Sequence, residues 1–323
     1  MGLIESLHLY RHLVKEGRRT IEDYNKQSSN SHGHTCLYNW WKSGAYLWFT
    51  KRYHDALEKT GKSINLCSVF GNRSVLDHVQ GIKVFFSGEN VHFAPYDEYA
   101  DYLLRDKSVS LALGFEQFED KRYLRFPLWL LYMFDPTSTR EDIVSRCNAL
   151  RFPVVSGRTR FCGMIASHDP NELRKAIVEE VERIAPVSCA GKYLHNDDSL
   201  KTVFGDDKIE YLRCFKFNIC PENSNSSGYV TEKLFEAISA GCIPVYWGSY
   251  NHPEPRIINP EAVVFWEKDQ NNQDVIQRID HLNSSPEELD ELLHLPRLLD
   301  GAEDVIWEMF RSLDSTILRI LES

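Results

Sequence analysis

The side chains best suited to chemistry lie in the segment from Glu222 to Lys233, which reads E-N-S-N-S-S-G-Y-V-T-E-K. Its Asn, Ser and Gly residues predict a turn-rich loop, and a helical pattern follows from about Val230 to Ala240. The backbone N–H groups of such a loop and of a helix N-terminus bind anions. Lys233 adds a positive charge in the first turn of that helix. The segment therefore predicts a site for an anionic ligand.

A second candidate is the carboxylate of Glu89, which follows the strand expected at Ile82–Phe86 in the sequence F-F-S-G-E-N. A carboxylate just past a strand end lies at the ligand-facing edge of an α/β sheet. Such a group can accept a proton from a reacting hydroxyl. The alternative is an exposed turn carboxylate, and the tripeptide G-E-N alone leaves both interpretations open.

Two strands are expected to flank the loop and helix of the anion site. An apolar run from Leu212 to Ile219 predicts the first strand, and Ile243–Trp247 predicts the second. Gly241 is a suitable C-cap for the helix between them. The result is a β-loop-α-β unit, which places ligands where the first strand leads into the helix.

The same stretch resembles the donor-binding signature of the α-1,3/4-fucosyltransferases, and of their bacterial members in particular. The matching blocks are F-N-I-C-P-E-N, Y-V-T-E-K-L and G-C-I-P-V-Y-W-G, at fixed spacing. F-F-S-G-E-N resembles the G-E-N motif of that family, and A-L-G-F-E-Q-F-E-D-K-R-Y-L-R-F-P-L-W resembles the segment after it. The resemblance extends from about Cys36 to Trp266.

The resemblance implies an α/β protein of GT-B-like architecture, with two Rossmann-like domains facing across a cleft and helices at the C-terminus. It implies transfer of L-fucose from GDP-fucose, with inversion, to O3 of an N-acetylglucosamine in a lactosamine-type, Lewis-antigen-like glycan. GDP-fucose is then the donor substrate, and no cofactor or metal is expected, since no Asp-x-Asp occurs in the chain. The alternatives are another nucleotide sugar, α-1,4 linkage, or a nucleotide- or glycan-binding protein without turnover.

The resemblance also implies roles for individual residues. Glu89 is the expected catalytic base, and Lys233, supported by Lys192, is expected to bind the diphosphate. Lys192 stands near the place where relatives carry a phosphate-binding arginine, and lysine lacks the bidentate fork of arginine. Glu232 is expected to accept hydrogen bonds from hydroxyls of ribose or fucose. Two further donor contacts are carried over by identical spacing, namely Asn223 and Tyr229.

Other residues have two interpretations each. Trp40 and Trp41 can stack on a sugar or pack in the core. Arg174 can help to hold the donor or lie on the surface, and Glu222 can be a second acid at the rim of the site or a surface charge. Further possible acceptor or donor contacts are Asn90 and His195.

Composition limits the class of protein. The formal net charge of −10 over 323 residues argues against nucleic acid or an anionic membrane as a general partner. There are eight cysteines and no C-x-x-C, which favours reduced thiols over a zinc site. The apolar surroundings of four of them predict burial, namely Cys67, Cys162, Cys214 and Cys242. No signal peptide or apolar run of membrane-spanning length is visible, so we expect a bacterial cytoplasmic enzyme with at most peripheral membrane association.

Alternation of strand and helix patterns predicts two domains and a C-terminal helix. Residues 1–155 are expected to form an N-terminal acceptor-binding Rossmann-like domain with a helical extension at residues 1–30. Residues 156–300 are expected to form the GDP-fucose-binding Rossmann-like domain. Residues 301–323 are expected to form a helix that packs back on the protein.

Overall fold

The computed structural model describes residues 3–29, 31–40, 46–101, 105–154 and 156–323. The chain forms two compact units. Unit 1 comprises Met1–Phe126, Asp135–Thr137 and Phe310–Ser323, and unit 2 comprises Pro127–Phe134 and Ser138–Met309. Both are α/β units built on largely parallel sheets, which confirms the predicted fold class.

Unit 1 is organised around a six-stranded sheet in the order β1-β2-β3-β4-β5-β6. Its strands are β1 (Ser31–His32), β2 (Thr35–Tyr38), β3 (Ile64–Cys67), β4 (Ile82–Phe86), β5 (Leu111–Gly114) and β6 (Tyr123–Arg125). β1 pairs antiparallel with β2, and each later pair is parallel. Every residue of β5 is buried, and β4 is buried from Lys83 onward. Because β2, β3 and β4 pair in parallel, the loops that leave β2 and β4 start from the same edge of the sheet.

The helices of unit 1 come from both ends of the chain. They are α1 (Leu3–Ser28), α2 (Tyr46–Arg52), α3 (His54–Thr60), η1 (Arg73–His78), η2 (Asp97–Tyr99) and the last part of α13 (Ala302–Glu322). Phe310 of α13 contacts the rings of Trp48 and Phe126, with centroids 5.7 Å and 5.6 Å apart. Asp314 accepts two hydrogen bonds from Arg52, at 2.7 Å and 2.6 Å.

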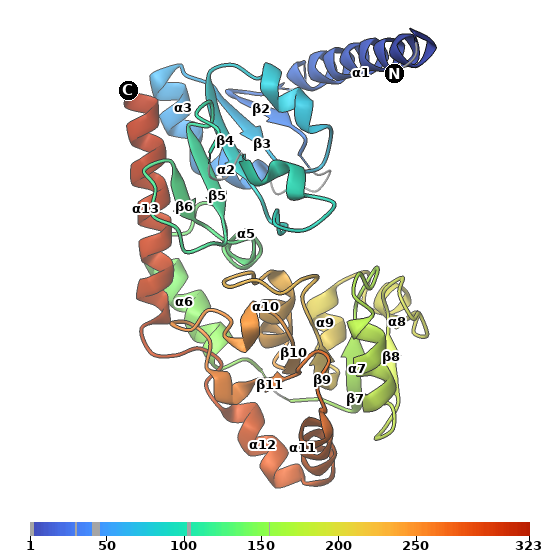
Figure 1. The fold of residues 1–323 in the computed structure, drawn as a ribbon. Helices are drawn as coiled ribbons and strands as arrows, with labels where there is room; N and C mark the ends of the chain where they lie inside the picture. Colours follow the sequence, from blue (N-terminus) through green and yellow to red (C-terminus); the bar gives the residue numbers. More distant parts are fainter. Residues whose placement is uncertain (1–2, 30, 41–45, 102–104, 155) are drawn as a thin grey trace. The chain divides into compact units, whose positions relative to one another are not determined.

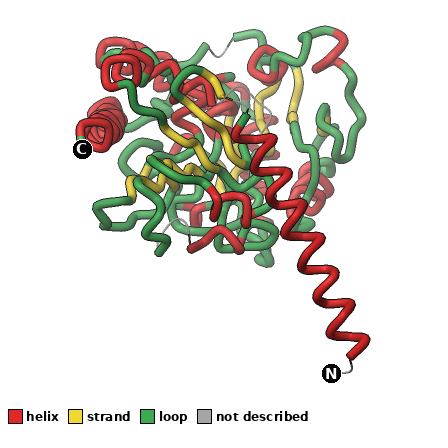
Figure 2. The backbone as a smooth tube through the Cα atoms, turned by 90° about the horizontal axis from the view of Figure 1, so that it is seen from above, coloured by secondary structure: helices red, strands yellow, loops and turns green. Residues whose placement is uncertain are grey.

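Helix α1 confirms the predicted N-terminal helix, and its C-terminal part is anchored on unit 1. Tyr24 stacks on Tyr38 with ring centroids 5.8 Å apart, and the hydroxyl of Thr20 accepts a hydrogen bond from Asn72 at 3.0 Å. The N-terminal part projects beyond the unit, as Figure 2 shows.

Unit 2 contains a five-stranded parallel sheet in the order β11-β10-β9-β7-β8. Its strands are β7 (Arg160–Met164), β8 (Val187–Cys189), β9 (Phe215–Ile219), β10 (Ile243–Tyr246) and β11 (Val264–Phe265). Counted along the chain this is the order 2-1-3-4-5 of a doubly wound sheet, in which the strand order reverses between β7 and β9. Ligands of such sheets bind at the carboxyl ends of the strands at that switch point.

Helices cover unit 2 around this sheet (Figure 1). They are α5 (Trp129–Met133), α6 (Arg140–Arg151), α7 (Leu173–Val181), α8 (Ser199–Thr202), α9 (Lys208–Leu212), α10 (Glu232–Ser239), η3 (Ser249–Asn251), η4 (Pro260–Ala262), α11 (Gln273–Ser284), α12 (Pro286–His294) and the first part of α13. Among the residues that the structure describes, none of these or the other helices has the length and apolar character that crossing a membrane requires.

Helix α10 carries the site residues, and its sequence explains why it forms. Leu234, Phe235 and Ile238 recur at helical spacing and are fully or almost fully buried. The ring of Phe235 stacks on Trp129 with centroids 4.0 Å apart. Gly241 follows the helix with φ of 75°, the left-handed conformation that favours glycine at this position.

Some local predictions were wrong. Leu212 belongs to helix α9, so the strand that follows starts only at Phe215. Cys214 is partly exposed, whereas Cys67, Cys162 and Cys242 are buried as predicted.

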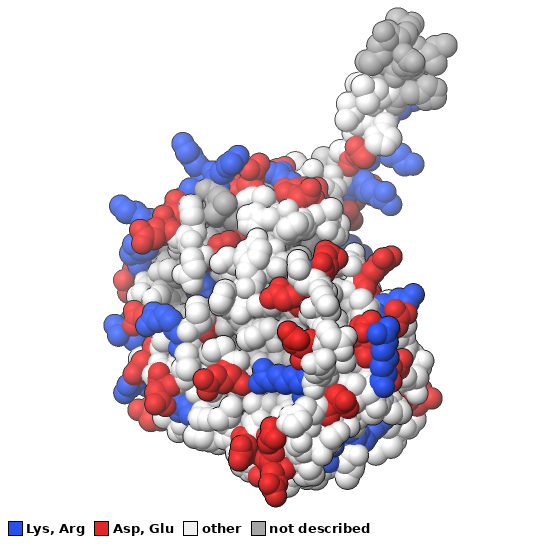
Figure 3. Space-filling view, turned by 60° about the horizontal axis from the view of Figure 1, so that its bottom comes forward, with Lys and Arg blue, Asp and Glu red and all other residues white. Residues whose placement is uncertain are grey.

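Lysines, arginines and acids are interspersed on the face shown in Figure 3, so the net negative charge is not gathered there.

Candidate functional site

Arg174 joins the two loops that leave the switch point of the unit 2 sheet. One guanidinium nitrogen donates to the backbone carbonyl of His168, in the loop after β7. The other donates to the carbonyl of Pro221 at 3.1 Å and to Oδ1 of Asn223 at 2.8 Å, in the loop after β9. Arg174 is only 4% exposed, so its interpretation as a surface arginine is wrong.

Glu222 is the buried anion of this site. Its side chain has no solvent exposure, so the interpretation as a rim or surface charge is wrong. It accepts hydrogen bonds from the backbone N–H and the hydroxyl of Thr231, both at 2.7 Å, and from the Tyr246 hydroxyl at 3.4 Å. Gly248 lies against it, since a Cβ there would stand 2.7 Å from Cγ of Glu222. The carboxylate therefore fixes the start of α10.

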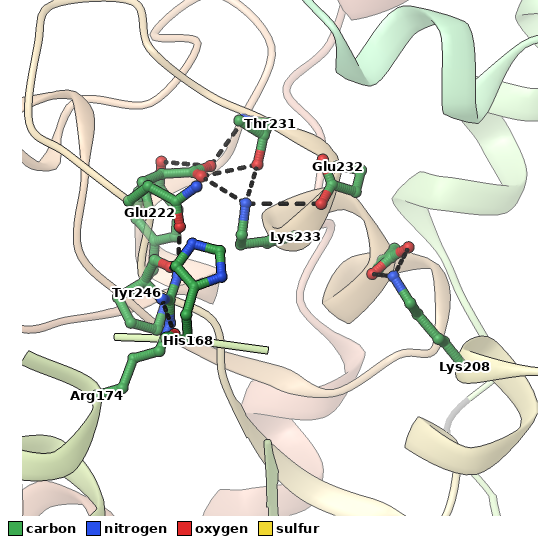
Figure 4. A network of polar contacts seen from close by, with 11 residues as sticks. His168, Arg174, Lys208, Glu222, Thr231, Glu232, Lys233 and Tyr246 are labelled. Carbon is green, nitrogen blue, oxygen red and sulfur yellow. Dashed lines mark hydrogen bonds and ion pairs between the residues drawn. The ribbon is translucent and has the colours of Figure 1, made fainter. Parts of the chain in front are cut away.

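Lys233 lies among three oxygen atoms at the start of α10, as Figure 4 shows. Its ammonium donates to the Thr231 hydroxyl at 2.8 Å and contacts Glu222 at 3.2 Å and Glu232 at 3.6 Å. The side chain is 23% exposed, so it is held by the protein and still reachable from solvent. This combination suits a cation that binds an incoming anion.

Glu232 and Glu236 share the face of α10 next to Lys233 and Lys208. Burial acts to raise the pKa of Glu232, but the nearby Lys233 and a backbone N–H outweigh it and hold the pKa below its usual value. Burial raises the pKa of Glu236, although Lys208 contacts it at 3.1 Å. The surroundings of Glu232 therefore favour its ionised form, which accepts hydrogen bonds.

His168 is an exposed residue at the same site that the sequence did not indicate. Partial burial, followed by the positive charges of Arg174 and Lys233, lowers the pKa of its imidazole, against an opposing effect of Asp169. Asp169 in turn accepts backbone hydrogen bonds from Arg174 and Lys175 at the start of α7, at 3.1 Å and 3.0 Å. Arg174 and Lys233 thus bring positive charge close to His168, where the loops after β7 and β9 meet.

The other predicted donor contacts lie in the same loop. The side chain of Asn223 contacts Arg174, as described above, and Tyr229 is 1% exposed. The backbone N–H of Tyr229 donates to the carbonyl of Ser226 at 3.0 Å, which closes the loop before α10. Tyr229 therefore supports the loop from inside.

Lys192 and His195 lie in the loop that follows β8, next to the loop after β7. Gly191 starts this loop against Ala166, whose backbone N–H and carbonyl leave no room for a side chain, with a Cβ only 2.0 Å from the carbonyl oxygen. Lys192 is exposed. His195 contacts the carbonyl of Gly191 and the carboxylate of Asp198, both at 2.9 Å, and these hydrogen bonds raise the pKa of its imidazole.

Glu89, the predicted base, belongs to unit 1 and follows β4. Ser87 shapes its turn, because its hydroxyl donates to the Glu89 carbonyl at 2.7 Å and accepts from the Glu89 N–H at 3.2 Å. The residue is partly exposed. Burial, and then the negative charge of Glu89, raises the pKa of Tyr96. The carboxylate thus lies near a tyrosine at the carboxyl edge of the sheet.

The other unit 1 candidates, Trp40 and Asn90, contact neighbouring residues of the protein. Trp40 lies beside the rings of Phe49 and Phe86, with centroids 6.2 Å and 6.1 Å away, so core packing accounts for part of its surface. Asn90 is buried, and its Oδ1 accepts from the N–H of His92 at 3.1 Å. Trp41 lies outside the described residues.

Unit 2 contains hollows of different size among its described residues. A small one of about 20 Å³ lies at the switch point between Arg174, Lys233 and Glu236. A larger one of about 570 Å³ lies between the start of α7 and the loop after β11. None of the site residues predicted from the sequence lines the larger hollow. Within the described part of the chain, no three His, Cys, Asp or Glu side chains are grouped as a metal ion requires.

Comparison with known proteins gives matches over both units. Residues 155–294 match the model of the C-terminal part of glycosyltransferase family 10 (fucosyltransferase), and residues 42–132 match that of the α-(1,3)-fucosyltransferase FucT N-terminal domain. The chain is 27% identical over 289 residues to α-(1,3)-fucosyltransferase FucT of Helicobacter pylori, covering 76% of this chain and 56% of that protein. The chain thus spans about half the length of that relative.

Solved structures show the same fold. A crystal structure of an α1,3-fucosyltransferase has a TM-score of 0.60 and 21% identity, covering 90% of this chain and 89% of that one. A crystal structure of α1,3-fucosyltransferase with GDP-fucose has a TM-score of 0.55 and 21% identity, covering 93% and 96%. This likeness confirms a GT-B-like fold with two Rossmann-like units. Together with the matches to both family models, it shows that the chain belongs to the fucosyltransferases of glycosyltransferase family 10.

Proposed function

We propose that the protein transfers L-fucose from GDP-fucose, with inversion, to O3 of an N-acetylglucosamine in a lactosamine-type glycan. The observation that carries this proposal is the position of Lys233, partly exposed at the N-terminus of α10 and at the switch point of the unit 2 sheet. Support for the donor comes from the related structure with GDP-fucose, and support for α-1,3 linkage comes from the H. pylori relative.

The donor residues act mainly on charge. As the bond from C1 of fucose to the diphosphate breaks, negative charge grows on the leaving oxygen. Lys233 and the N–H groups at the start of α10 stabilise that charge, and Lys192 adds a second cation. Glu232 stays ionised beside Lys233 and accepts hydrogen bonds from sugar hydroxyls.

Glu89 accepts the proton of the acceptor hydroxyl in this proposal. Inversion by a single displacement needs a base on the side of the attacking hydroxyl, opposite the leaving diphosphate. Glu89 comes from unit 1 and the diphosphate-binding residues come from unit 2. Its carboxylate is partly exposed on a turn fixed by Ser87, as a base that meets different acceptors requires.

The direct test measures GDP formation from GDP-fucose with and without N-acetyllactosamine, with GDP-mannose as the matched donor. We expect turnover with GDP-fucose that rises with acceptor, and a product linked to O3 by NMR. Linkage to O4 would replace the α-1,3 assignment. Turnover with GDP-mannose alone would reassign the donor. Binding of GDP-fucose with no turnover on a panel of acceptors would indicate a binding protein.

The base is tested by Glu89→Gln, with the exposed Glu98→Gln as control. General-base assistance contributes about 10²–10⁴ in rate, so kcat should fall by that order while GDP affinity stays unchanged. Glu98→Gln should match wild type in both. A Glu89→Gln variant within a few fold of the wild-type kcat, where chemistry limits the rate, removes Glu89 from the mechanism.

We further propose that transfer needs no divalent metal and occurs in the cytoplasm. The lysines and the helix N-terminus already supply charge for the diphosphate. Activity should therefore persist in excess EDTA, and loss of activity that Mn²⁺ alone restores would contradict this. The cytoplasmic location is tested by fractionation of the source cells.

A further inference from the structure

We infer that the turn Ser249–Asn251 presents the ring of Tyr250 as a stacking surface for a sugar ring of the transfer reaction. This inference rests on the proposed function. It concerns a residue outside the diphosphate-binding set, at the carboxyl end of β10, the strand next to β9 in the unit 2 sheet.

The backbone of this turn has an unusual conformation. Ser249, Tyr250 and Asn251 have φ values of 51°, 49° and 56°. Left-handed backbone is unfavourable for residues with a side chain, and it normally occurs at single positions. A run of such residues persists only where the surroundings hold it, and strain of this kind gathers at ligand-binding sites.

The contacts that hold the turn come from the loop between β9 and α10, here called the donor loop, and from the residues that follow β11. The N–H of Tyr250 donates to Oδ1 of Asn225 at 2.6 Å. The hydroxyl of Ser249 accepts from the N–H of Gly228 at 3.0 Å. The side-chain amide of Asn251 donates to the Trp266 carbonyl at 3.0 Å and to Glu267 at 2.8 Å.

Anchoring and exposure are divided within the turn. Ser249 is 3% exposed, whereas Tyr250 is 62% exposed. The polar contacts therefore hold the backbone of the turn and its flanking residues, and the ring of Tyr250 is exposed to solvent. A pyranose has an apolar C–H face on which an aromatic ring can stack, and the fixed backbone of the turn saves the entropic cost of ordering it on binding.

The sugar can be the fucosyl group of the donor or a ring of the acceptor, and both present the same C–H face. The donor loop links Tyr250 to the residues around Lys233, since Asn225 and Gly228 belong to the segment that leads into α10. The nucleotide itself needs no contact with this ring. Affinity for GDP alone is therefore the measurement that separates a sugar contact from a general role of the turn.

The experiment compares Tyr250→Ala and Tyr250→Phe with Phe152→Ala, an aromatic deletion at a residue that is also 62% exposed and belongs to unit 2. GDP and GDP-fucose affinities are measured by calorimetry, and KM is measured for N-acetyllactosamine. Tyr250→Ala should leave GDP affinity unchanged. It should weaken GDP-fucose binding or raise the acceptor KM by roughly five- to tenfold. Tyr250→Phe and Phe152→Ala should match wild type.

The two arms identify the sugar. Weaker GDP-fucose binding assigns the ring to the donor sugar, and a raised acceptor KM alone assigns it to the acceptor. Unchanged values in both, with an active wild type, would overturn the inference and leave the proposed function intact. Equal loss of GDP and GDP-fucose affinity would also overturn it, since the turn would then act only through the donor loop. A wild-type protein that neither binds nor uses GDP-fucose would refute the proposed function and the inference together.

Discussion

Removal of Lys233 has two effects, because its ammonium both faces solvent and contacts a fully buried carboxylate. Lys233→Ala should weaken GDP binding by about 1.5–3 kcal/mol through loss of a charge-assisted contact. The variant also removes the ammonium that lies 3.2 Å from the buried carboxylate of Glu222. Loss of one partner of a buried pair costs about 3–5 kcal/mol of folding stability. Calorimetry and urea unfolding measure the two effects separately.

The double variant Lys233→Ala/Glu222→Gln serves as the control. The neutral amide keeps the shape of Glu222, so most of the lost stability should return while GDP affinity stays low. Recovery of GDP affinity in the double variant would show that Lys233 acts on the fold and does not bind the diphosphate. Equal stability of Lys233→Ala and wild type would contradict the buried pair.

His168 offers a pH-dependent test of the same site. Burial and two nearby cations lower the pKa of its imidazole, from an ordinary value of about 6.5. A bound diphosphate brings negative charge close to it, which favours the protonated ring and raises that pKa. GDP binding should therefore raise the pKa of His168 in an NMR titration.

The sign of the effect fixes the expected pH dependence of affinity. Because the bound form holds the proton more tightly, His168 makes GDP binding stronger as the pH falls through the raised pKa. His168→Gln should remove this part of the pH dependence, and the remainder belongs to the nucleotide. A His168 pKa that stays constant or falls on GDP binding would place the diphosphate elsewhere.

At the scale of elements, the loop after β8 depends on one glycine. Gly191→Ala places a Cβ 2.0 Å from the Ala166 carbonyl oxygen, so backbone must move, at a cost of about 1–3 kcal/mol. Both stability and GDP affinity should fall, because Lys192 moves with the loop. Lys192→Ala should lower GDP affinity alone. Gly17→Ala, with no atom within 4 Å of the new Cβ, should be neutral or stabilise α1 by about 0.5–1 kcal/mol.

One outcome of the Gly191→Ala experiment would contradict the proposed role of Lys192. If Gly191→Ala lost stability and kept full GDP affinity, Lys192 would have no part in binding the diphosphate. Unfolding curves and calorimetry on the same preparations decide between the two outcomes.

The sequence predicted elements where one continuous apolar pattern defines them. The strand at Ile82–Phe86 has the expected bounds, because an apolar run between turn residues determines it locally. The two-residue strand β1 and the helices α2 and α3 were not predicted. Ser31 and His32 are polar and gain strand structure only by pairing with β2, a contact that composition does not reveal.

The site was predicted in part for the same reason. The chain from Asn223 to Lys233 is contiguous, so its loop and helix could be read together. Glu222 was misjudged, because its burial depends on Gly248 and Tyr246, more than twenty residues away and on the neighbouring strand. Arg174 was ambiguous until the fold brought it to Pro221 and Asn223.

At the scale of the whole molecule, α13 belongs to both units, with residues up to Met309 in unit 2 and from Phe310 in unit 1. Its end is fixed in unit 1 by Asp314, which accepts hydrogen bonds from Arg52 and from the Tyr53 hydroxyl at 3.0 Å. The Arg52 side chain is 9% exposed. The C-terminal residues are therefore part of the core of unit 1.

Asp314→Ala should lower the free energy of unfolding by about 1.5–3 kcal/mol, since hydrogen bonds to a charged partner are lost at a largely buried arginine. The matched control is Asp101→Ala, which breaks the exposed pair with Arg105 and should change stability by less than about 1 kcal/mol. Urea unfolding measures both. Equal effects of the two changes would show that the contact of Asp314 with Arg52 adds no more stability than an exposed ion pair.

Under the proposed function, the carboxylate beneath Lys233 also bears on the rate of product release. Glu222 lies 3.2 Å from the ammonium and would compete with a bound diphosphate for its positive charge, so we expect it to shorten the lifetime of the complex with product GDP. Product release limits the turnover rate of many enzymes. Glu222→Gln should therefore slow GDP dissociation in stopped-flow experiments and lower kcat while tightening GDP affinity. Faster dissociation in that variant would mean that Glu222 acts by holding Lys233 in place for the nucleotide.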